Sequence, residues 1–323
     1  MRTRPFVTRT NTATIEDVEA CYELLLNRAP DADGLAHYRR RIDSAHVSVL
    51  DVVAEMVGSP EYAVAHQALA EPATITVDAG RFRLHVFSAD HAIGHAMAVT
   101  GAFEEEVSDT LADLLRPGSV FVDVGANYGW HSLLAASIVG SNGRVIAVEP
   151  NPLNTRLLER SAAENGFSNI TVATMATSDR DGFGVLETDG SNGRIISLDS
   201  LDAGIEDPVA CSYVVPLRRL DRIIEGAGNP AVDVIKIDVE GFELATLGGA
   251  SGLIARCHPV IVSEFFPTAL RSTGGVEPES YLNALRDLEY SLSVVGREGK
   301  ATNAEIAAGL GSNDHVDVVA TPV

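Results

Sequence analysis

The segment VFVDVGANYG, residues 120–129, says more about the fold of this chain than any other stretch of the sequence. An apolar run ends in an acid and a glycine-rich turn, and an apolar helical pattern follows at once. In open α/β sheets a turn of this kind lies where ligands bind, beyond the carboxyl ends of the strands. Gly125 and Gly129 allow the backbone to approach a ligand without an intervening Cβ atom. The segment therefore predicts a ligand-binding turn at the edge of a parallel sheet.

Strand and helix patterns alternate from this segment onward. The expected strands are residues 120–124, 144–148, 170–175, 232–238 and 259–264, and the expected helices are about 129–139, 152–165 and 241–250. This alternation predicts an α/β fold with a doubly wound, mostly parallel sheet and helices on both faces. A helix at 281–288 and strands at 291–295 and 316–320 bring the expected sheet to seven strands. Residues 176–230 break the rhythm and predict an inserted hairpin region beside the ligand site.

A helical pattern fills the N-terminal part of the chain. Helices are expected to begin near Thr14, Asp31 and Ser48, with a short one near Ser59, and residues 1–12 are expected to be frayed. From Thr74 the period changes to that of a β-hairpin, and a helix is expected from about residue 104. We therefore predict a small all-helical domain at residues 1–72 and an α/β domain at residues 73–323.

Charge and composition argue against several classes of partner. The formal net charge is −21, which repels polyanions at long range, so we expect no nucleic-acid partner. The sequence contains no apolar run long enough to cross a bilayer and no secretory signal, so we expect a cytoplasmic protein without a transmembrane segment. Its three cysteines are far apart and are expected to be reduced and buried. Homo-oligomer formation is left open.

The chemistry of the turn favours one class of cofactor. A dinucleotide fingerprint has the spacing G-x-G-x-x-G, whereas here Asn127 lies between Gly125 and Gly129, and Asp123 precedes them. A carboxylate at this place is poorly suited to a pyrophosphate and well suited to a ligand with an ammonium and a sulfonium group. S-adenosylmethionine is such a ligand, and we expect it here. A nicotinamide-dependent oxidoreductase is the alternative enzyme, and calorimetry with S-adenosylhomocysteine and NAD distinguishes the two.

The next two strand ends provide the remaining cofactor candidates. Glu149 follows Gly129 by 20 residues, the usual distance for a carboxylate that binds ribose hydroxyls, and Pro150 and Asn151 come directly after it. Thr177, or its neighbour Ser178, follows the third strand at the expected level of an adenine.

Three acids are expected at the carboxyl ends of two further strands, namely Asp238, Glu240 and Glu264. Removing a proton makes a hydroxyl a better nucleophile, and a positioned carboxylate is a suitable base, with Glu240 the favoured one. The same acids are candidate Mg²⁺ ligands, because hard oxygen donors suit that ion. The competing interpretation is that Glu240 caps the helix expected at Gly241.

Two basic residues near the turn have both functional and structural interpretations. His131, in the first turn of the expected helix, is a candidate contact to the methionine part of the cofactor or to the acceptor. A buried structural histidine is the alternative. Lys236 lies inside an expected strand and is expected to pair with an acid.

Four segments together resemble the FkbM family of methyltransferases: VFVDVGANYGWHSLLAA at 120–136, GRVIAVEPNP at 143–152, VDVIKIDVEGFELATLGGA at 232–250 and HPVIVSEF at 258–265. The upstream Gly101-Ala-Phe-Glu104 also resembles the family, and the similarity extends over about residues 75–320. The resemblance implies a class I methyltransferase fold and transfer of a methyl group from S-adenosylmethionine to a hydroxyl oxygen. Its known acceptors include polyketides and saccharides.

The N-terminal part resembles a bacterial helical domain of unknown function that often accompanies proteins of cell-surface glycans. The residues that carry this resemblance are Arg28, Pro30, Asp31, Gly34, Leu35 and Tyr38, followed by Ser59-Pro60-Glu61-Tyr62. It favours a sugar of a glycan or glycolipid as the acceptor. Local capping and pairing of Arg28, Asp31 and Asp33 is the preferred interpretation of the motif. A non-catalytic binding protein of a glycan-processing complex is the alternative from another functional class.

Overall fold

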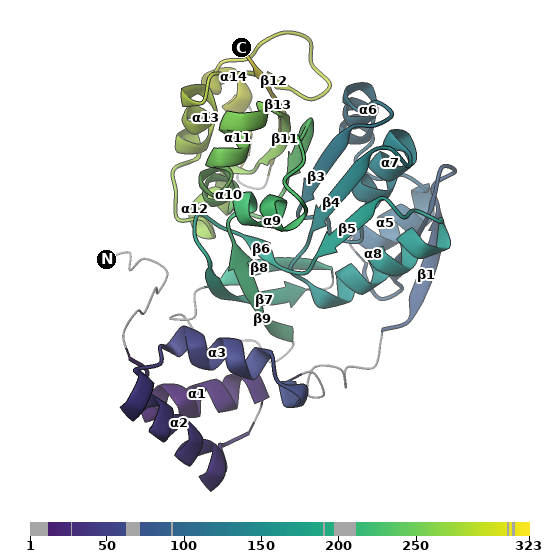
Figure 1. Ribbon diagram of the computed structural model, residues 1–323. Helices are drawn as coiled ribbons and strands as arrows, with labels where there is room; N and C mark the ends of the chain where they lie inside the picture. Colours follow the sequence, from purple (N-terminus) through teal and green to yellow (C-terminus); the bar gives the residue numbers. More distant parts are fainter. Residues whose placement is uncertain are drawn as a thin grey trace. The chain divides into compact units, whose positions relative to one another are not determined.

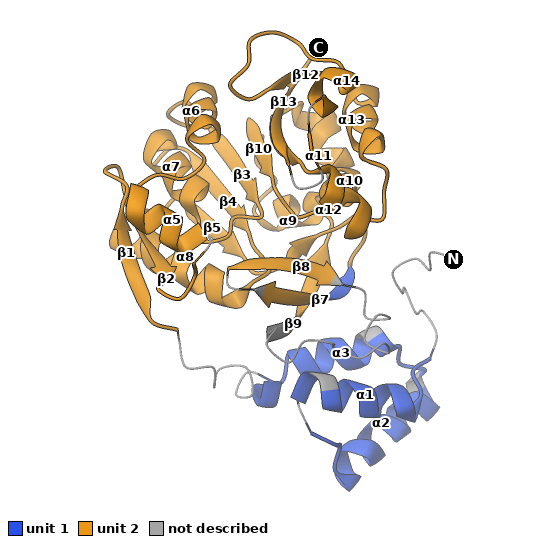
Figure 2. Cartoon of the chain, turned by 180° about the vertical axis from the view of Figure 1, so that it is seen from behind, with its two compact units in different colours: residues 1–71, 182–185, 197–206 blue, residues 72–181, 186–196, 207–323 orange. Residues whose placement is uncertain are grey.

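The computed structural model describes residues 12–26, 28–62, 72–91, 93–189, 191–196, 211–308, 310–311 and 314–323. The expected frayed segment, apart from residue 12, and the end of the helical domain at 63–71 therefore lie outside the described residues. Contacts divide the chain into unit 1, residues 1–71, 182–185 and 197–206, and unit 2, the remainder (Figure 2).

Unit 1 contains three helices, α1 (Ile15–Leu26), α2 (Ala32–Ala45) and α3 (Val49–Val57). Their starts are those expected from the sequence. Asp17 accepts a hydrogen bond from the Thr14 N–H at 2.8 Å, and Asp31 accepts one from the Gly34 N–H at 2.7 Å. Ser48 and Asp51 form a complete capping box at the start of α3. Of the short helix expected near residue 59, only residues 60–62 are described as helical.

The motif residues of unit 1 connect its segments. Arg28 donates two hydrogen bonds to the Glu61 carboxylate, and its guanidinium lies 4.9 Å from the centre of the Tyr22 ring. A Cβ atom at Gly34 would come within 2.4 Å of the Tyr22 hydroxyl, so a larger residue there would displace the Tyr22 side chain. These contacts agree with the structural interpretation of the motif.

The main sheet of unit 2 has seven strands in the order β12-β13-β11-β10-β3-β4-β5 (Figure 1). Their bounds are β3 Val120–Val124, β4 Arg144–Val148, β5 Ile170–Ala173, β10 Val234–Ile237, β11 Val260–Phe265, β12 Tyr290–Val294 and β13 Val316–Pro322. Five strands pair in parallel, and β13 pairs antiparallel with both β11 and β12. The predicted doubly wound, mostly parallel sheet is therefore confirmed. Strand order reverses between β3 and β10, where ligands bind in such sheets.

Helices cover both faces of this sheet because alternate strand residues point to opposite sides. Val122 and Val124 share a core with residues of α9, α10, α11 and α13, whereas Phe121 packs with residues of α6 and α7. The bounds are α5 Ile93–Thr100, α6 Glu105–Leu114, α7 Trp130–Val139, α8 Pro152–Glu164, α9 Leu220–Gly226, α10 Glu243–Gly249, α11 Ser251–Cys257, α12 Pro267–Ser272, α13 Pro278–Asp287 and α14 Asn303–Ala307. The sequence pattern did not predict α5, α11, α12 or α14.

The two expected hairpin regions are present. β1 (Thr74–Asp78) pairs antiparallel with β2 (Arg83–Phe87). The region after residue 176 contributes a four-stranded sheet of β6 (Ala176–Thr177), β9 (Cys211–Arg218), β7 (Gly182–Asp189) and β8 (Asn192–Ile196), in that order. Residues 197–210 of the expected insertion lie outside the described residues.

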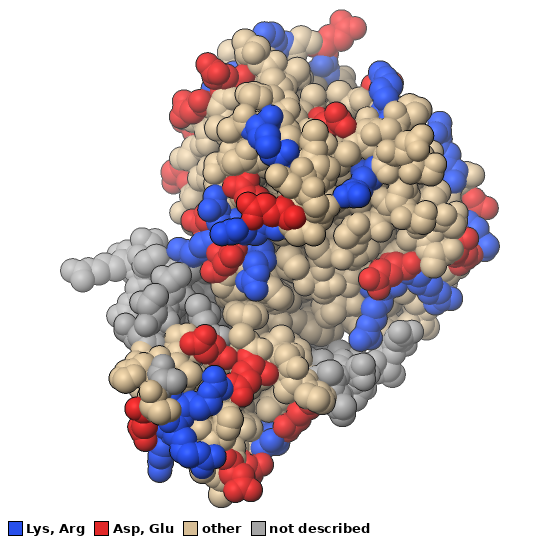
Figure 3. Space-filling view, viewed as in Figure 1, with Lys and Arg blue, Asp and Glu red and all other residues tan. Residues whose placement is uncertain are grey.

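The described surface carries both signs of charge. On the face shown in Figure 3, Lys and Arg side chains are interspersed with Asp and Glu. Within the described ranges, no helix has the length and apolar character needed to cross a membrane. Cys21 is buried and Cys257 half-buried, and both are free thiols, whereas the side chain of Cys211 is outside the described residues.

Candidate active site

A cavity of about 300 Å³ lies beside the carboxyl ends of β3, β4 and β10. The predicted site residues that line it are Gly125, Asn127, His131, Glu149, Pro150, Thr177, Asp238, Glu240 and Glu264. Three other predicted residues, Asp123, Gly129 and Asn151, are not among its lining residues. The fold thus brings most of the candidates from five separate segments to one cavity. Whether they bind or catalyse remains a prediction.

The two glycines of the β3–α7 turn are required by their protein neighbours. Gly125 has φ +83°, and a Cβ atom there would lie 1.7 Å from the carbonyl oxygen of Asp238. Gly129 has φ +90°, and its Cβ would lie 2.1 Å from a methyl carbon of Leu158. Left-handed backbone and close packing therefore explain both glycines, and the expected approach to a ligand stays a prediction.

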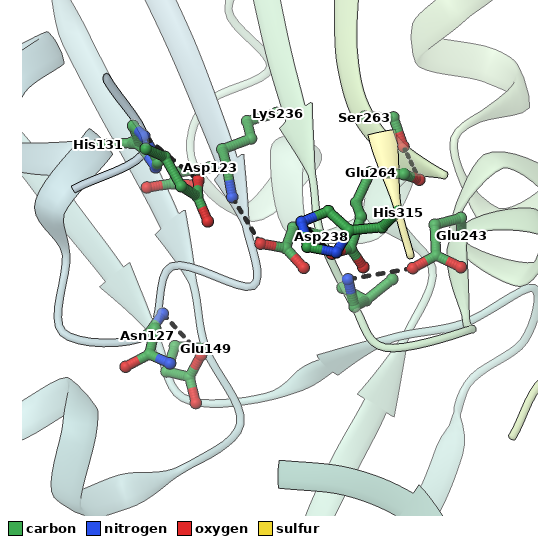
Figure 4. Close-up of polar contacts among 12 residues, drawn as sticks. Asp123, Asn127, His131, Glu149, Lys236, Asp238, Glu243, Ser263, Glu264 and His315 are labelled. Carbon is green, nitrogen blue, oxygen red and sulfur yellow. Dashed lines mark hydrogen bonds and ion pairs between the residues drawn. The ribbon is translucent and has the colours of Figure 1, made fainter. Parts of the chain in front are cut away.

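Glu149, at the end of β4, is buried and held by the turn. Its two oxygens accept hydrogen bonds from the backbone N–H groups of Asn127 and Asn151, each at 2.9 Å. Burial raises the pKa of the Glu149 carboxyl to about 7, although these hydrogen bonds lower it. Figure 4 shows this carboxylate beside Asn127, away from the other labelled acids. Glu149 is thus a fixed acceptor that faces the cavity.

Asn151 and Thr177 already have protein partners. The Asn151 side chain caps α8 by accepting from the Leu153 N–H at 3.0 Å, which explains its absence from the cavity wall. The Thr177 hydroxyl lies 2.5 Å from that of Thr246, while Thr177 still lines the cavity. Ser178, the alternative to Thr177, is buried and does not line it.

Asp123 lies behind the cavity wall. Its Oδ2 accepts a hydrogen bond from the Ser132 hydroxyl at 2.6 Å, and its Oδ1 has no hydrogen-bond partner among the described residues. Burial raises the pKa of this carboxyl, and Lys236, at the paired position on β10, opposes that shift. Asp123 is therefore next to Lys236 but does not line the cavity, and its part in cofactor binding stays a prediction.

Lys236 is a buried ammonium among carboxylates, and it pairs with an acid as predicted. Its Nζ lies 2.9 Å from Asp238 Oδ2 (Figure 4). Burial lowers its pKa, but Asp238, Glu104 and Asp123 raise it by more, so the group is charged. Glu104 and Lys236 also line the cavity.

His131 is buried on the first turn of α7. Its Nε2 has no hydrogen-bond partner among the described residues and lies 3.6 Å from a carboxylate oxygen of Glu104. Burial and the nearby Lys236 lower its pKa well below the usual range, so the ring is neutral. Burial also raises the pKa of Glu104 to about 7.

Glu240 is not the cap of the helix that follows it. α10 begins at Glu243, whose Oε1 accepts from the backbone N–H groups of Val239 and Gly241 at 3.3 and 3.0 Å. Burial raises the pKa of Glu243 to about 7, and Glu243 does not line the cavity. The capping interpretation of Glu240 is therefore wrong, and sequence analysis missed Glu243, although its place two residues after a glycine was a usable signal.

The third acid, Glu264 on β11, faces a residue that the sequence analysis did not single out. His315 Nε2 lies 3.8 Å from Glu264 Oε1, and both line the cavity. Burial, with Asp238 and Glu240 nearby, raises the pKa of Glu264 to about 10. Among the described residues, no three His, Cys, Asp or Glu side chains form a group suited to a metal ion. The three candidate Mg²⁺ ligands thus do not fit that role.

A second unpredicted contribution comes from the β7–β8 turn. Ser191, Asn192 and Gly193 line the cavity. Buried Asp90 accepts hydrogen bonds from the Ser191 hydroxyl at 2.5 Å and from the Tyr128 hydroxyl at 2.9 Å. This network fixes the inserted hairpin against the β3–α7 turn. No motif marks Asp90 in the sequence.

Comparisons with known proteins agree with the geometry. A sequence model described as the methyltransferase FkbM domain matches residues 123–292, more than half of the chain. A second one, described as a domain of unknown function (DUF4214), matches residues 3–65. The first confirms the family resemblance of the α/β domain, and the second matches most of the predicted helical domain.

Individual relatives are more distant. The AMB antimetabolite synthetase AmbE of Pseudomonas aeruginosa is 32% identical over 177 residues, which cover 46% of this chain but only 8% of the synthetase. The hexuronic acid methyltransferase AglP of Haloferax volcanii is 26% identical over 192 residues, covering 59% of this chain and 71% of that protein. Among solved structures, methyltransferase FkbM from Methylobacillus flagellatus KT has 16% identity and a TM-score of 0.40, covering 93% of this chain and 58% of that one.

Proposed function

The chain belongs to the FkbM methyltransferase family, and from that premise we propose that it transfers a methyl group from S-adenosylmethionine to a hydroxyl oxygen of a sugar. The single observation that carries the proposal is that acids from β10 and β11 open into the same cavity as Glu149 of β4. A relative named as a hexuronic acid methyltransferase supports a sugar acceptor.

The residues present fit S-adenosylmethionine. A cavity of about 300 Å³ is within the range of small-molecule sites. The fixed carboxylate of Glu149 would hold the ribose hydroxyls, and the unpartnered Nε2 of His131 would accept or donate one further hydrogen bond. When bound, the cofactor supplies an electrophilic methyl carbon on a sulfonium.

The turn is poorly suited to the pyrophosphate of NAD. Backbone N–H groups at a strand-to-helix turn are what a pyrophosphate normally uses. Here the N–H of Asn127 is already donated to the Glu149 carboxylate, which would also repel a phosphate. This argues against the alternative of an oxidoreductase.

We propose Glu240 as the base that takes the proton of the acceptor hydroxyl. It lines the cavity, whereas Glu243 accepts hydrogen bonds from backbone N–H groups of the turn before α10. Asp238, held by Lys236, and Glu264 would orient the acceptor through hydrogen bonds. Much of the rate would come from aligning the hydroxyl oxygen with the methyl carbon. The mechanism needs no step through Mg²⁺, because the candidate ligands do not form a metal site in the described chain.

The test is incubation of the protein with labelled S-adenosylmethionine and a panel of sugars that includes a hexuronic acid. A second incubation replaces the sugars by a lysate fraction of the source organism. We expect label in a methyl ether, unchanged by a chelator. S-adenosylhomocysteine binding without label transfer to any fraction would contradict the proposed activity. Loss of transfer on chelation would contradict the metal-free mechanism.

A further inference from the structure

One end of the cavity holds opposite charges side by side. The side chain of Lys236 is only 5% exposed and lies 2.9 Å from Asp238. Glu104 interacts electrostatically with Lys236, and its carboxylate lies 3.6 Å from His131 Nε2. All four residues line the cavity, and they come from three separate segments of the chain.

This end has hydrogen-bonding capacity that the described chain does not use. An ammonium has three N–H donors, and Lys236 makes a single hydrogen bond, to Asp238, among the described residues. His131 is 4% exposed, and its Nε2 has no partner there. Buried polar groups are nearly always hydrogen-bonded, so these atoms call for a ligand with both donors and acceptors.

The carboxylate of Glu104 does not cap the helix that begins next to it. It occupies the N-cap position of α6 with φ +43°, yet its side chain makes no capping hydrogen bond. Non-glycine residues in left-handed conformation are uncommon and concentrate at functional sites. The backbone at Glu104 therefore directs a carboxylate to the cavity rather than to the helix.

We propose that Lys236 and Glu104 form a clamp for the amino-acid end of S-adenosylmethionine. In this clamp Lys236 donates to the α-carboxylate, Glu104 accepts from the α-ammonium, and His131 Nε2 makes one further hydrogen bond. The inference rests on the proposed function. It transfers to Glu104 and Lys236 the role that sequence analysis gave to Asp123, which is 1% exposed and bonded to Ser132 behind the cavity wall.

The test compares two ligands by calorimetry on the full chain. 5′-Methylthioadenosine shares the nucleoside and sulfur of S-adenosylhomocysteine but lacks the amino-acid end. Glu104→Gln is expected to weaken S-adenosylhomocysteine binding by about tenfold or more, since a charge-assisted contact is lost, and to change methylthioadenosine binding by less than about twofold. Lys236→Met is expected to show the same selectivity. If Lys236→Met does not fold because Lys236 is buried, the result for Glu104→Gln alone tests the clamp.

Asp317→Asn is the matched control. Asp317 also interacts with Lys236 but does not line the cavity, so its loss is expected to leave both affinities within about twofold of wild type. Equal weakening of both ligands by Glu104→Gln, or unchanged S-adenosylhomocysteine binding, would overturn the clamp. A wild-type chain that binds neither ligand would instead contradict the proposed function.

Discussion

Glu240 and Glu243 illustrate what residue type alone predicts at a site. Both are acids near the end of β10, and the sequence places either one at a helix start. Only the backbone decides between them: Glu240 has φ +51° and lines the cavity, whereas Glu243 accepts the N–H groups of the turn. Residue type predicted an acid at this edge, but the division of roles depends on a turn geometry that no local pattern reveals.

Replacing Glu240 tests the proposed base. Glu240→Gln is expected to lower kcat by about 10²- to 10⁴-fold, as loss of a general base does. A base acts as its carboxylate, and burial raises the pKa of Glu240, so wild-type kcat/KM should rise with pH through an apparent pKa above the ordinary value. This limb should be absent in Glu240→Gln. The measurement is a pH profile with the identified acceptor.

Glu243→Gln is the control for this profile, because Glu243 does not line the cavity. In Glu243→Gln, kcat/KM should still rise with pH as it does in the wild type. Unchanged methyl transfer by Glu240→Gln, or a profile that keeps its limb in that variant, would refute the assignment of the base.

Substitutions at Gly125 and Gly118 distinguish two ways in which replacing a glycine lowers stability, namely backbone conformation and steric collision. Both have left-handed φ, but a Cβ at Gly118 meets no atom within 4 Å, whereas one at Gly125 would collide with the Asp238 carbonyl. Gly118→Ala should cost about 1 kcal/mol of stability from backbone conformation alone. Gly125→Ala should cost more and abolish S-adenosylhomocysteine binding. Denaturant titration and calorimetry measure both, and equal costs would show that the β3–α7 turn can relax around a Cβ.

At the scale of elements, periodicity predicted the strands of the main sheet and the helices α7 and α8 because these signals are local. The break at residues 176–230 was visible for the same reason. The residue that holds this insertion in place was not predicted. It is Asp90, in the loop before α5, which accepts a hydrogen bond from Ser191, 101 residues away in the sequence. A buried acid with two hydroxyl partners leaves no periodic trace, so the element that positions the β7–β8 turn could not be predicted.

Tyr128→Phe tests whether this network shapes the cavity. It removes one hydrogen bond to Asp90 and should cost about 1–3 kcal/mol, because a buried carboxylate loses one of its two hydroxyl donors while Ser191 remains. Tyr281→Phe removes a comparable buried hydrogen bond, to Ser263, away from the cavity. Only Tyr128→Phe should weaken S-adenosylhomocysteine binding several-fold. Equal effects of the two variants on affinity would show that the network has no particular connection to the site.

At the scale of the whole molecule, charge and composition gave expectations that the structure does not test, such as the absence of a nucleic-acid partner. The domain boundary at residue 72 likewise remains a proposal. The described cavity-lining residues all lie in unit 2, which contains most of the residues of the FkbM match. The function of residues 1–72 therefore has to be determined by removing them.

Deletion of residues 1–72 is expected to leave the affinity for S-adenosylhomocysteine within about twofold of the full chain, because the described cavity lies outside them. The acceptor KM and the oligomeric state, measured on the same protein, test a role in acceptor binding or assembly. A folded truncated chain that fails to bind S-adenosylhomocysteine would contradict the assignment of the cofactor site to unit 2.

A crystal structure with S-adenosylhomocysteine is the most direct test of the whole account. It should show the nucleoside in the cavity beside the β3–α7 turn, with both ribose hydroxyls within hydrogen-bonding distance of the Glu149 carboxylate. An empty cavity, or a ligand bound elsewhere and without contact to Glu149, would contradict the account at its centre.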